Sequence, residues 1–108
     1  MRIQQHEDTL HVLGLRELDS ANAAIVHEAI LKVATDTVRH IEVDLSGAVF
    51  LDSCGLGTLL ALRKLVAPRG GVVRLLDPGP AAQQFLGLTR LYRVLEVVRC
   101  EEVPDSSN

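Results

Sequence analysis

Residues 43–57 read VDLSGAVFLDSCGLG, and this stretch decides the fold. From two residues before its beginning, Ile41, Val43 and Leu45 alternate with charged residues, which is the two-residue period of a β-strand. Past its centre, apolar residues recur at helical spacing: Leu56, Leu59, Leu60 and Val66. The polar pair Asp52-Ser53 is therefore predicted to lie at a corner where a strand gives way to a helix.

The start of a helix is a chemically distinct place. Its first backbone N–H groups have no partner within the helix and carry the positive end of the helix dipole, so a side-chain oxygen or a phosphate is stabilised there. Asp and Ser are also among the commonest helix N-caps, and capping alone explains the pair without any function. The residues by themselves leave two interpretations open, a structural cap and a modifiable hydroxyl at Ser53, with the cap favoured.

Composition predicts one small globular domain. The chain has 108 residues, of which 47% are hydrophobic and 23% are charged. We expect the domain to span residues 1–100 and residues 101–108 to form a flexible tail, because the tail has no apolar period. No apolar run approaches the ~18 residues of a membrane-spanning helix, so we expect a cytoplasmic protein without membrane insertion. The net charge of −3 and the 3% aromatic content argue against direct nucleic-acid binding.

Apolar periods place the remaining elements along the chain. Strands are predicted over residues 2–6, 9–13, 72–76 and 94–98, and the first pair would bury Ile3, Leu10 and Val12. Asp19 and Ser20 are expected to cap a helix with an apolar stripe: Ile25, Val26, Ala29, Ile30 and Val33. A third helix is expected to begin at residues 78–80, with its apolar positions at Ala82, Phe85, Leu86 and Thr89. Phe50 is expected in the core, as large apolar residues usually are.

This order of elements predicts an α/β fold. The expected sheet is mixed but largely parallel, with four to five strands and three main helices, and its crossovers are right-handed. Because the carboxyl ends of parallel strands meet at one sheet edge, we expect Asp52 and Ser53 there, with Asp19 as a candidate neighbour.

The sequence shows no catalytic, metal or cofactor motif. Its histidines are scattered and lie outside any metal-ligand spacing: His6, His11, His27 and His40. Ser53 does not stand in a Gly-x-Ser-x-Gly elbow, and no histidine follows residue 40 to serve as a general base. No glycine-rich phosphate loop follows a strand, so ATP for any modification of Ser53 would come from another protein. We therefore predict a protein that is not an enzyme and needs no cofactor.

Residues 51–57, LDSCGLG, resemble the Asp-Ser-Ser-Gly-Leu signature of the STAS domain, in the branch of bacterial anti-sigma factor antagonists. Cys54 replaces the second serine of that signature. Residues 17–19 and 88–94 are also similar to the family, although Arg16 and Arg90 stand where it usually has glycine. The resemblance implies a STAS-like fold in which the loop before the first helix lies beside the signature loop on the partner-binding surface.

The same resemblance implies a partner-switching function in sigma factor control, transcription regulation and stress response. The unphosphorylated protein would bind an anti-sigma factor that is also a serine kinase, and so release a sigma factor. Phosphorylation of Ser53 would turn binding off, and a serine phosphatase would be a further partner. The implied partner-binding residues are Asp19, Asp52, Ser53, Cys54, Gly55 and Leu56.

Two other functions remain open at this point. A STAS module can act as a scaffold or as an accessory subunit of a transporter, without phosphorylation. Alternatively, Cys54 could make the protein a thiol-based redox sensor, with or without Cys100, since a cysteine near a helix N-terminus can have a lowered pKa. Exposed apolar side chains near the corner could belong to a partner surface, and the candidates are Val49, Phe50 and Leu56.

Overall fold

The computed structural model describes residues 1–90 and 93–99. Within them the elements follow one another in this order: β1 (Arg2–His6), β2 (Thr9–Leu13), β3 (Glu17–Leu18), α1 (Ala23–Val33), β4 (His40–Asp44), β5 (Phe50–Leu51), α2 (Ser53–Val66), a short 3-10 helix (Ala67–Arg69), β6 (Val73–Leu76), α3 (Pro80–Thr89) and β7 (Glu96–Val98). The expected tail and Cys100 lie outside the described residues.

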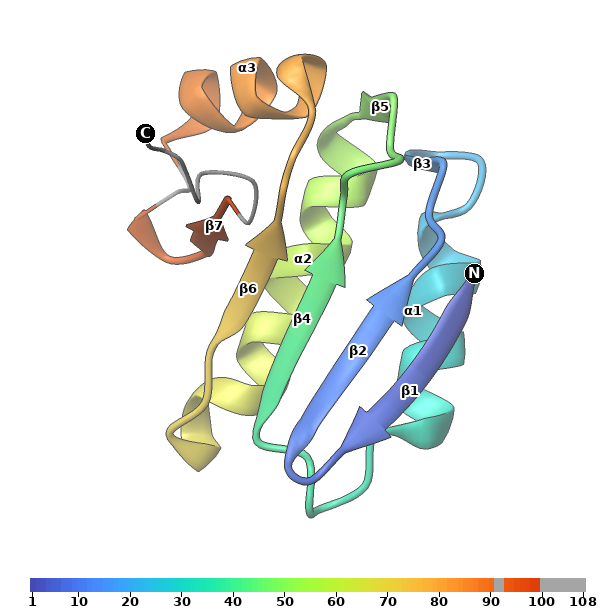
Figure 1. Cartoon of the computed structure of the whole chain (residues 1–108), viewed down its shortest axis with the longest axis vertical. Coiled ribbons are helices and arrows are strands. Elements are labelled where there is room, and N and C mark those ends of the chain that lie inside the picture. The colour runs from blue at the N-terminus through green and yellow to red at the C-terminus, as the bar shows by residue number, and fades with distance from the viewer. Residues whose placement is uncertain (91–92, 100–108) are drawn as a thin grey trace, which may run out of the picture.

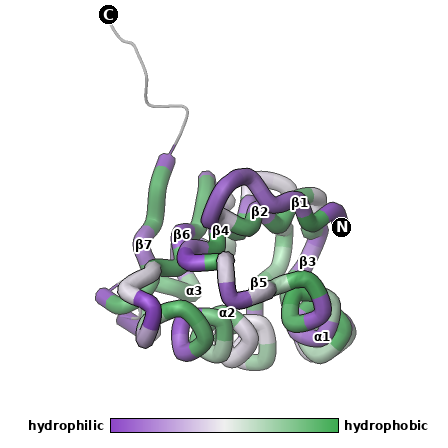
Figure 2. Tube along the Cα trace, turned by 90° about the horizontal axis from the view of Figure 1, so that it is seen from below, coloured by the Kyte–Doolittle hydropathy of each residue, from purple (hydrophilic) through white to green (hydrophobic). Residues whose placement is uncertain are grey.

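Among the described residues, the main sheet has five strands in the order β1-β2-β4-β6-β7 (Figure 1). β1 runs antiparallel to β2, and the later neighbours pair in parallel. Helices α1 and α2 lie together on one side of this sheet, as Figure 2 shows from below. The predicted mixed and largely parallel α/β fold is confirmed.

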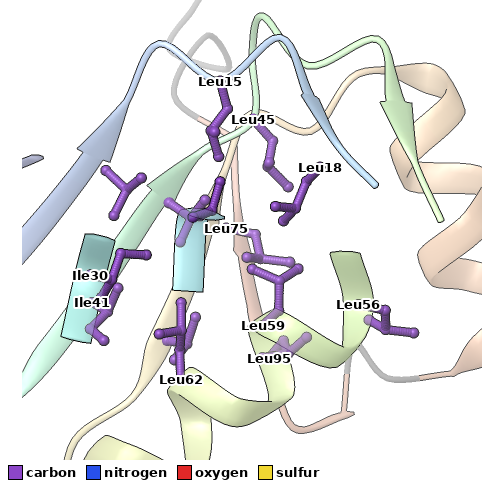
Figure 3. Packing of buried hydrophobic residues seen from close by; sticks show 14 of the residues in the cluster. Leu15, Leu18, Ile30, Ile41, Leu45, Leu56, Leu59, Leu62, Leu75 and Leu95 are labelled. Carbon is purple, nitrogen blue, oxygen red and sulfur yellow. The ribbon is translucent and has the colours of Figure 1, made fainter. Parts of the chain in front are cut away.

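The core lies between the sheet and the helices. Alternate residues of the central strands point into it and are buried: Leu10, Val12, Ile41, Val43, Val73 and Leu75. Leu59 and Leu62 of α2 are fully buried against them (Figure 3). Ile3 packs at the margin of this cluster, so the inward positions predicted for the first two strands are confirmed. Burying one such leucine stabilises the fold by roughly 1.5–3 kcal/mol.

The opposite face of the sheet carries a row of polar side chains. The register aligns His11, Glu42, Arg74 and Glu96 across four strands. Glu42 contacts His11 at 3.1 Å and Arg74 at 3.3 Å, and Arg74 contacts Glu96 at 3.1 Å. These side chains alternate with the buried ones along each strand, as expected for a sheet with one solvated face.

Helix α1 differs from its prediction in two respects. Its N-cap is Asn22, while Asp19 and Ser20 lie in the turn before it. Its buried positions are Ala23, Val26 and Ile30, whereas Ile25 is 64% exposed and Val33 is 43% exposed. The predicted stripe was wrong at both of these positions, because α1 packs against the rest of the fold only along the narrow line of its buried residues. At the start of this line, the Thr58 hydroxyl of α2 donates a hydrogen bond to the Ala23 carbonyl at 3.2 Å.

The predicted burial of Phe50 was also wrong, since its side chain is 52% exposed. Phe50 and Leu51 form the short strand β5, which pairs in parallel with β3 outside the main sheet. Successive strand residues point to opposite faces. Leu51 takes the inward position at 5% exposure, which leaves Phe50 on the outer side.

Candidate functional site

Asp52 is the N-cap of α2. Its Oδ1 atom accepts hydrogen bonds from the backbone N–H groups of Cys54 at 2.9 Å and Gly55 at 3.0 Å. Such a carboxylate satisfies the unpaired donors of the first turn and lies at the positive end of the helix dipole. The N–H of Gly55, followed by those of Ser20 and Cys54, holds the pKa of the Asp52 carboxyl below its ordinary value against the opposing effect of desolvation. Asp52 is therefore a fixed negative charge at neutral pH.

The same carboxylate joins two loops that are distant in the sequence. The Oδ2 atom of Asp52 accepts a hydrogen bond from the N–H of Ser20 at 3.1 Å. Next to this contact, β3 and β5 pair so that Leu18 lies opposite Leu51. The loop before α1 thus lies beside the signature loop, as the family resemblance implied.

Asp19 lies in that first loop and is half-buried. Its Oδ1 atom accepts a hydrogen bond from the N–H of Ala21 at 2.9 Å, and its own N–H donates to the Asn22 side chain at 2.9 Å. These bonds fix the turn that presents Ser20 to Asp52. Asp19 therefore shapes the loop beside the signature, and part of its surface remains accessible.

Ser53 is the first residue of α2, and it is exposed. Within residues 1–90 and 93–99, no side chain or backbone group forms a hydrogen bond with its hydroxyl. The sequence predicted that the first N–H groups of this helix could stabilise a phosphate. In the structure, Asp52 already accepts hydrogen bonds from the N–H groups of Cys54 and Gly55. A phosphate on Ser53 would therefore lie beside a carboxylate that competes for the same donors.

Of the remaining predicted site residues, Cys54 lies at the surface, whereas Gly55 and Leu56 lie beneath it. Cys54 is exposed and is a free thiol. Gly55 is buried, and a Cβ atom on it would lie 2.0 Å from the Leu18 carbonyl oxygen. Leu56 is only 7% exposed and belongs to the core cluster. Gly55 and Leu56 therefore support the loop from below and present little side chain to a partner.

Ser20 is a site residue that the sequence did not single out for this role. It was expected to cap α1, and its backbone N–H instead binds the cap of α2. No sequence signal marks such a contact, since any residue except proline has that N–H group.

The part of the chain that the structure describes contains no cluster of three or more His, Cys, Asp or Glu residues placed to hold a metal ion. None of its helices is both long enough and apolar enough to cross a bilayer.

The sequence is similar to those of known proteins. The model of the STAS domain family matches residues 1–103. The anti-sigma F factor antagonist of Paenibacillus polymyxa is 28% identical over 101 residues, which cover 90% of this chain and 84% of that protein.

Two solved structures are similar in fold. The Thermotoga maritima protein TM1081 superimposes with a TM-score of 0.78 at 22% identity, over 90% of this chain and 84% of that one. An anti-sigma factor antagonist from Mycobacterium paratuberculosis superimposes with a TM-score of 0.74 at 25% identity, over 90% of this chain and 82% of that one.

The fold, the capped signature loop and the family match together define the class of protein. The chain belongs to the STAS domain family. Within that family it is similar to the anti-sigma factor antagonists.

Proposed function

We propose that this protein is an anti-sigma factor antagonist switched by phosphorylation of Ser53. In the unphosphorylated state it binds an anti-sigma factor that is also a serine kinase, and the sigma factor is released. The kinase supplies the ATP, and a serine phosphatase restores the binding state. These exchanges take place in the cytoplasm.

One observation carries the proposal. Ser53 presents an exposed hydroxyl, without a hydrogen-bond partner among the described residues, next to the fixed carboxylate of Asp52. A partner that forms a hydrogen bond with a neutral hydroxyl can cover it at little cost, and a kinase can reach it without unfolding the loop.

Phosphorylation changes the charge of this surface. A seryl phosphate carries about −1.5 to −2 charges at neutral pH. Next to Asp52 it concentrates negative charge at one point, and a partner that covered it would have to remove its water. The partner-binding surface would include Asp19, Asp52, Ser53 and Cys54, with Gly55 and Leu56 holding the loop from beneath.

Substitution of Ser53 tests this function. The Ser53→Ala variant should bind the anti-sigma factor constitutively, also with ATP present, and Ser53→Asp should bind at least about tenfold more weakly. Ser46→Asp is a matched control, because Ser46 is an exposed serine in the turn after β4. Equal affinities of the Ser53→Ala and Ser53→Asp variants would contradict the proposal.

A further inference from the structure

An apolar groove lies next to the signature loop that carries Ser53. Its walls are β5 and α3, and the open space between them is about 210 Å³. The lining residues are Phe50, Leu51, Ala81, Gln84, Phe85 and Leu88. None of them carries a charge, so the groove offers no partner for an ionic group.

Two of the lining side chains are large and mostly exposed to water. Phe50 is 52% exposed and Leu88 is 78% exposed. They come from segments far apart in the sequence, and the fold brings them to the same groove. Single apolar residues on a surface are ordinary, but several that gather around one concavity are typical of an interaction site.

The groove is continuous with the proposed switch. Leu51 forms part of its wall and is followed directly by Asp52 and Ser53. Leu51 is buried and paired with β3, so the Phe50 backbone is held in a fixed position relative to the start of α2. A protein surface that covers Ser53 would therefore reach the groove with little further extension.

We propose that this groove receives an apolar side chain of the same anti-sigma factor that contacts Ser53. This inference rests on the proposed function and adds an anchor to its binding surface. The apolar contact supplies affinity, since well-packed apolar anchors dominate interface energies. Phosphorylation of the adjacent Ser53 hydroxyl controls binding. A partner anchored in the groove excludes water around Ser53, and this raises the free energy of enclosing a phosphate there.

A second copy of this chain fits the groove less well. In a twofold contact centred on the groove, the two Asp52 carboxylates, each directly after the lining residue Leu51, would approach one another, and like charges brought together in an interface oppose association.

Polar substitutions at the exposed lining residues test the inference. Leu88→Gln removes the apolar surface at an exposed position of α3, and glutamine is a good helix former, so the fold is retained. Phe50→Thr makes the corresponding change on β5, where threonine suits a strand. Leu31→Gln is the matched control, because Leu31 is 46% exposed on α1 and does not line the groove.

Binding is measured by interferometry on the immobilised anti-sigma factor kinases of the source organism, each purified and loaded with ADP. Leu88→Gln and Phe50→Thr should each weaken binding about tenfold, and Leu31→Gln should change it by less than about twofold. Circular dichroism of every variant verifies the fold.

The possible outcomes separate this inference from the proposed function. If Leu88→Gln and Phe50→Thr bind like the unmodified protein while Ser53→Asp still blocks binding, the groove is not the anchor and the switch stands. If neither the unmodified protein nor Ser53→Ala binds any of the kinases, the proposed function fails, and the inference fails with it. A dimer in light scattering that Leu88→Gln converts to a monomer would assign the groove to a second copy and overturn the inference.

Discussion

Gly55 lies so close to Leu18 that a Cβ atom at residue 55 would be 2.0 Å from the Leu18 carbonyl oxygen. The first turn of α2 therefore rests directly on the backbone of β3. Because β3 leads into the loop that carries Asp19 and Ser20, this contact fixes the distance between the two loops of the site. The glycine of the signature is thus explained by packing.

Alanine substitution at the two glycines of α2 tests this packing. Gly55→Ala should lower the free energy of unfolding by about 1–3 kcal/mol, the usual cost of overpacking. Gly57→Ala should raise it by about 0.5–1 kcal/mol, since a Cβ atom at residue 57 meets nothing within 4 Å and alanine favours the helix. Urea unfolding measures both values. A Gly55→Ala protein as stable as the unmodified chain would contradict the close approach.

The Asp52 cap predicts a pH-dependent stability. Its pKa in the folded protein lies below the ordinary value of 3.8, so the carboxylate stabilises the fold above that pH, and the effect is lost as the pH falls through the lower, folded pKa. Thermal melts should show a lower Tm for Asp52→Asn at neutral pH, and the difference should shrink below pH 3.8. Asp36→Asn is the control, because the Asp36 side chain is exposed and makes no hydrogen bond to any of the described residues. A difference that stayed constant down to pH 2 would count against the cap as a charged group.

Arg74 links two carboxylates on the open face of the sheet. Replacing it by glutamine removes the positive charge that both Glu42 and Glu96 contact and leaves both carboxylates without this partner. The expected loss is about 0.5–1 kcal/mol of unfolding free energy, because these side chains are partly exposed. Added salt should reduce the loss, and a loss that is independent of salt would show that the effect is one of packing.

The exposed thiol of Cys54 allows a test between phosphorylation and redox control. On the phosphorylation account, Cys54→Ser restores the second serine of the usual signature and should change affinity for the anti-sigma factor by less than about twofold. Peroxide treatment of the unmodified protein should likewise leave binding intact. If oxidation abolished binding while Cys54→Ser remained resistant, the redox-sensing function would be favoured.

The sequence was informative where periodic patterns are long. The alternation of Ile41, Val43 and Leu45 correctly predicted β4, and the helical spacing after Asp52 correctly predicted α2. The position of Asp52 and Ser53 at a strand-to-helix corner followed directly, whereas the exposure of Ser53 is a finding of the structure. The predicted features follow from hydrophobic periods within one segment, so they can be predicted without knowing which distant segments it contacts.

Other features depend on contacts between distant segments. β3 and β5 have two residues each, too few to show a period, and they exist because they pair with one another. The exposure of Phe50 follows from that pairing. The bond from Ser20 to Asp52 joins residues 32 positions apart through a backbone group that every sequence offers.

The central claim is that Ser53 is the phosphorylated residue. The most direct measurement is mass spectrometry of the intact and digested protein after incubation with the anti-sigma factor kinases of its organism and ATP. The account predicts one phosphate, located on Ser53, and none on the Ser53→Ala variant. Phosphate on another residue, or a stable complex with a kinase that leaves the protein unmodified, would contradict it.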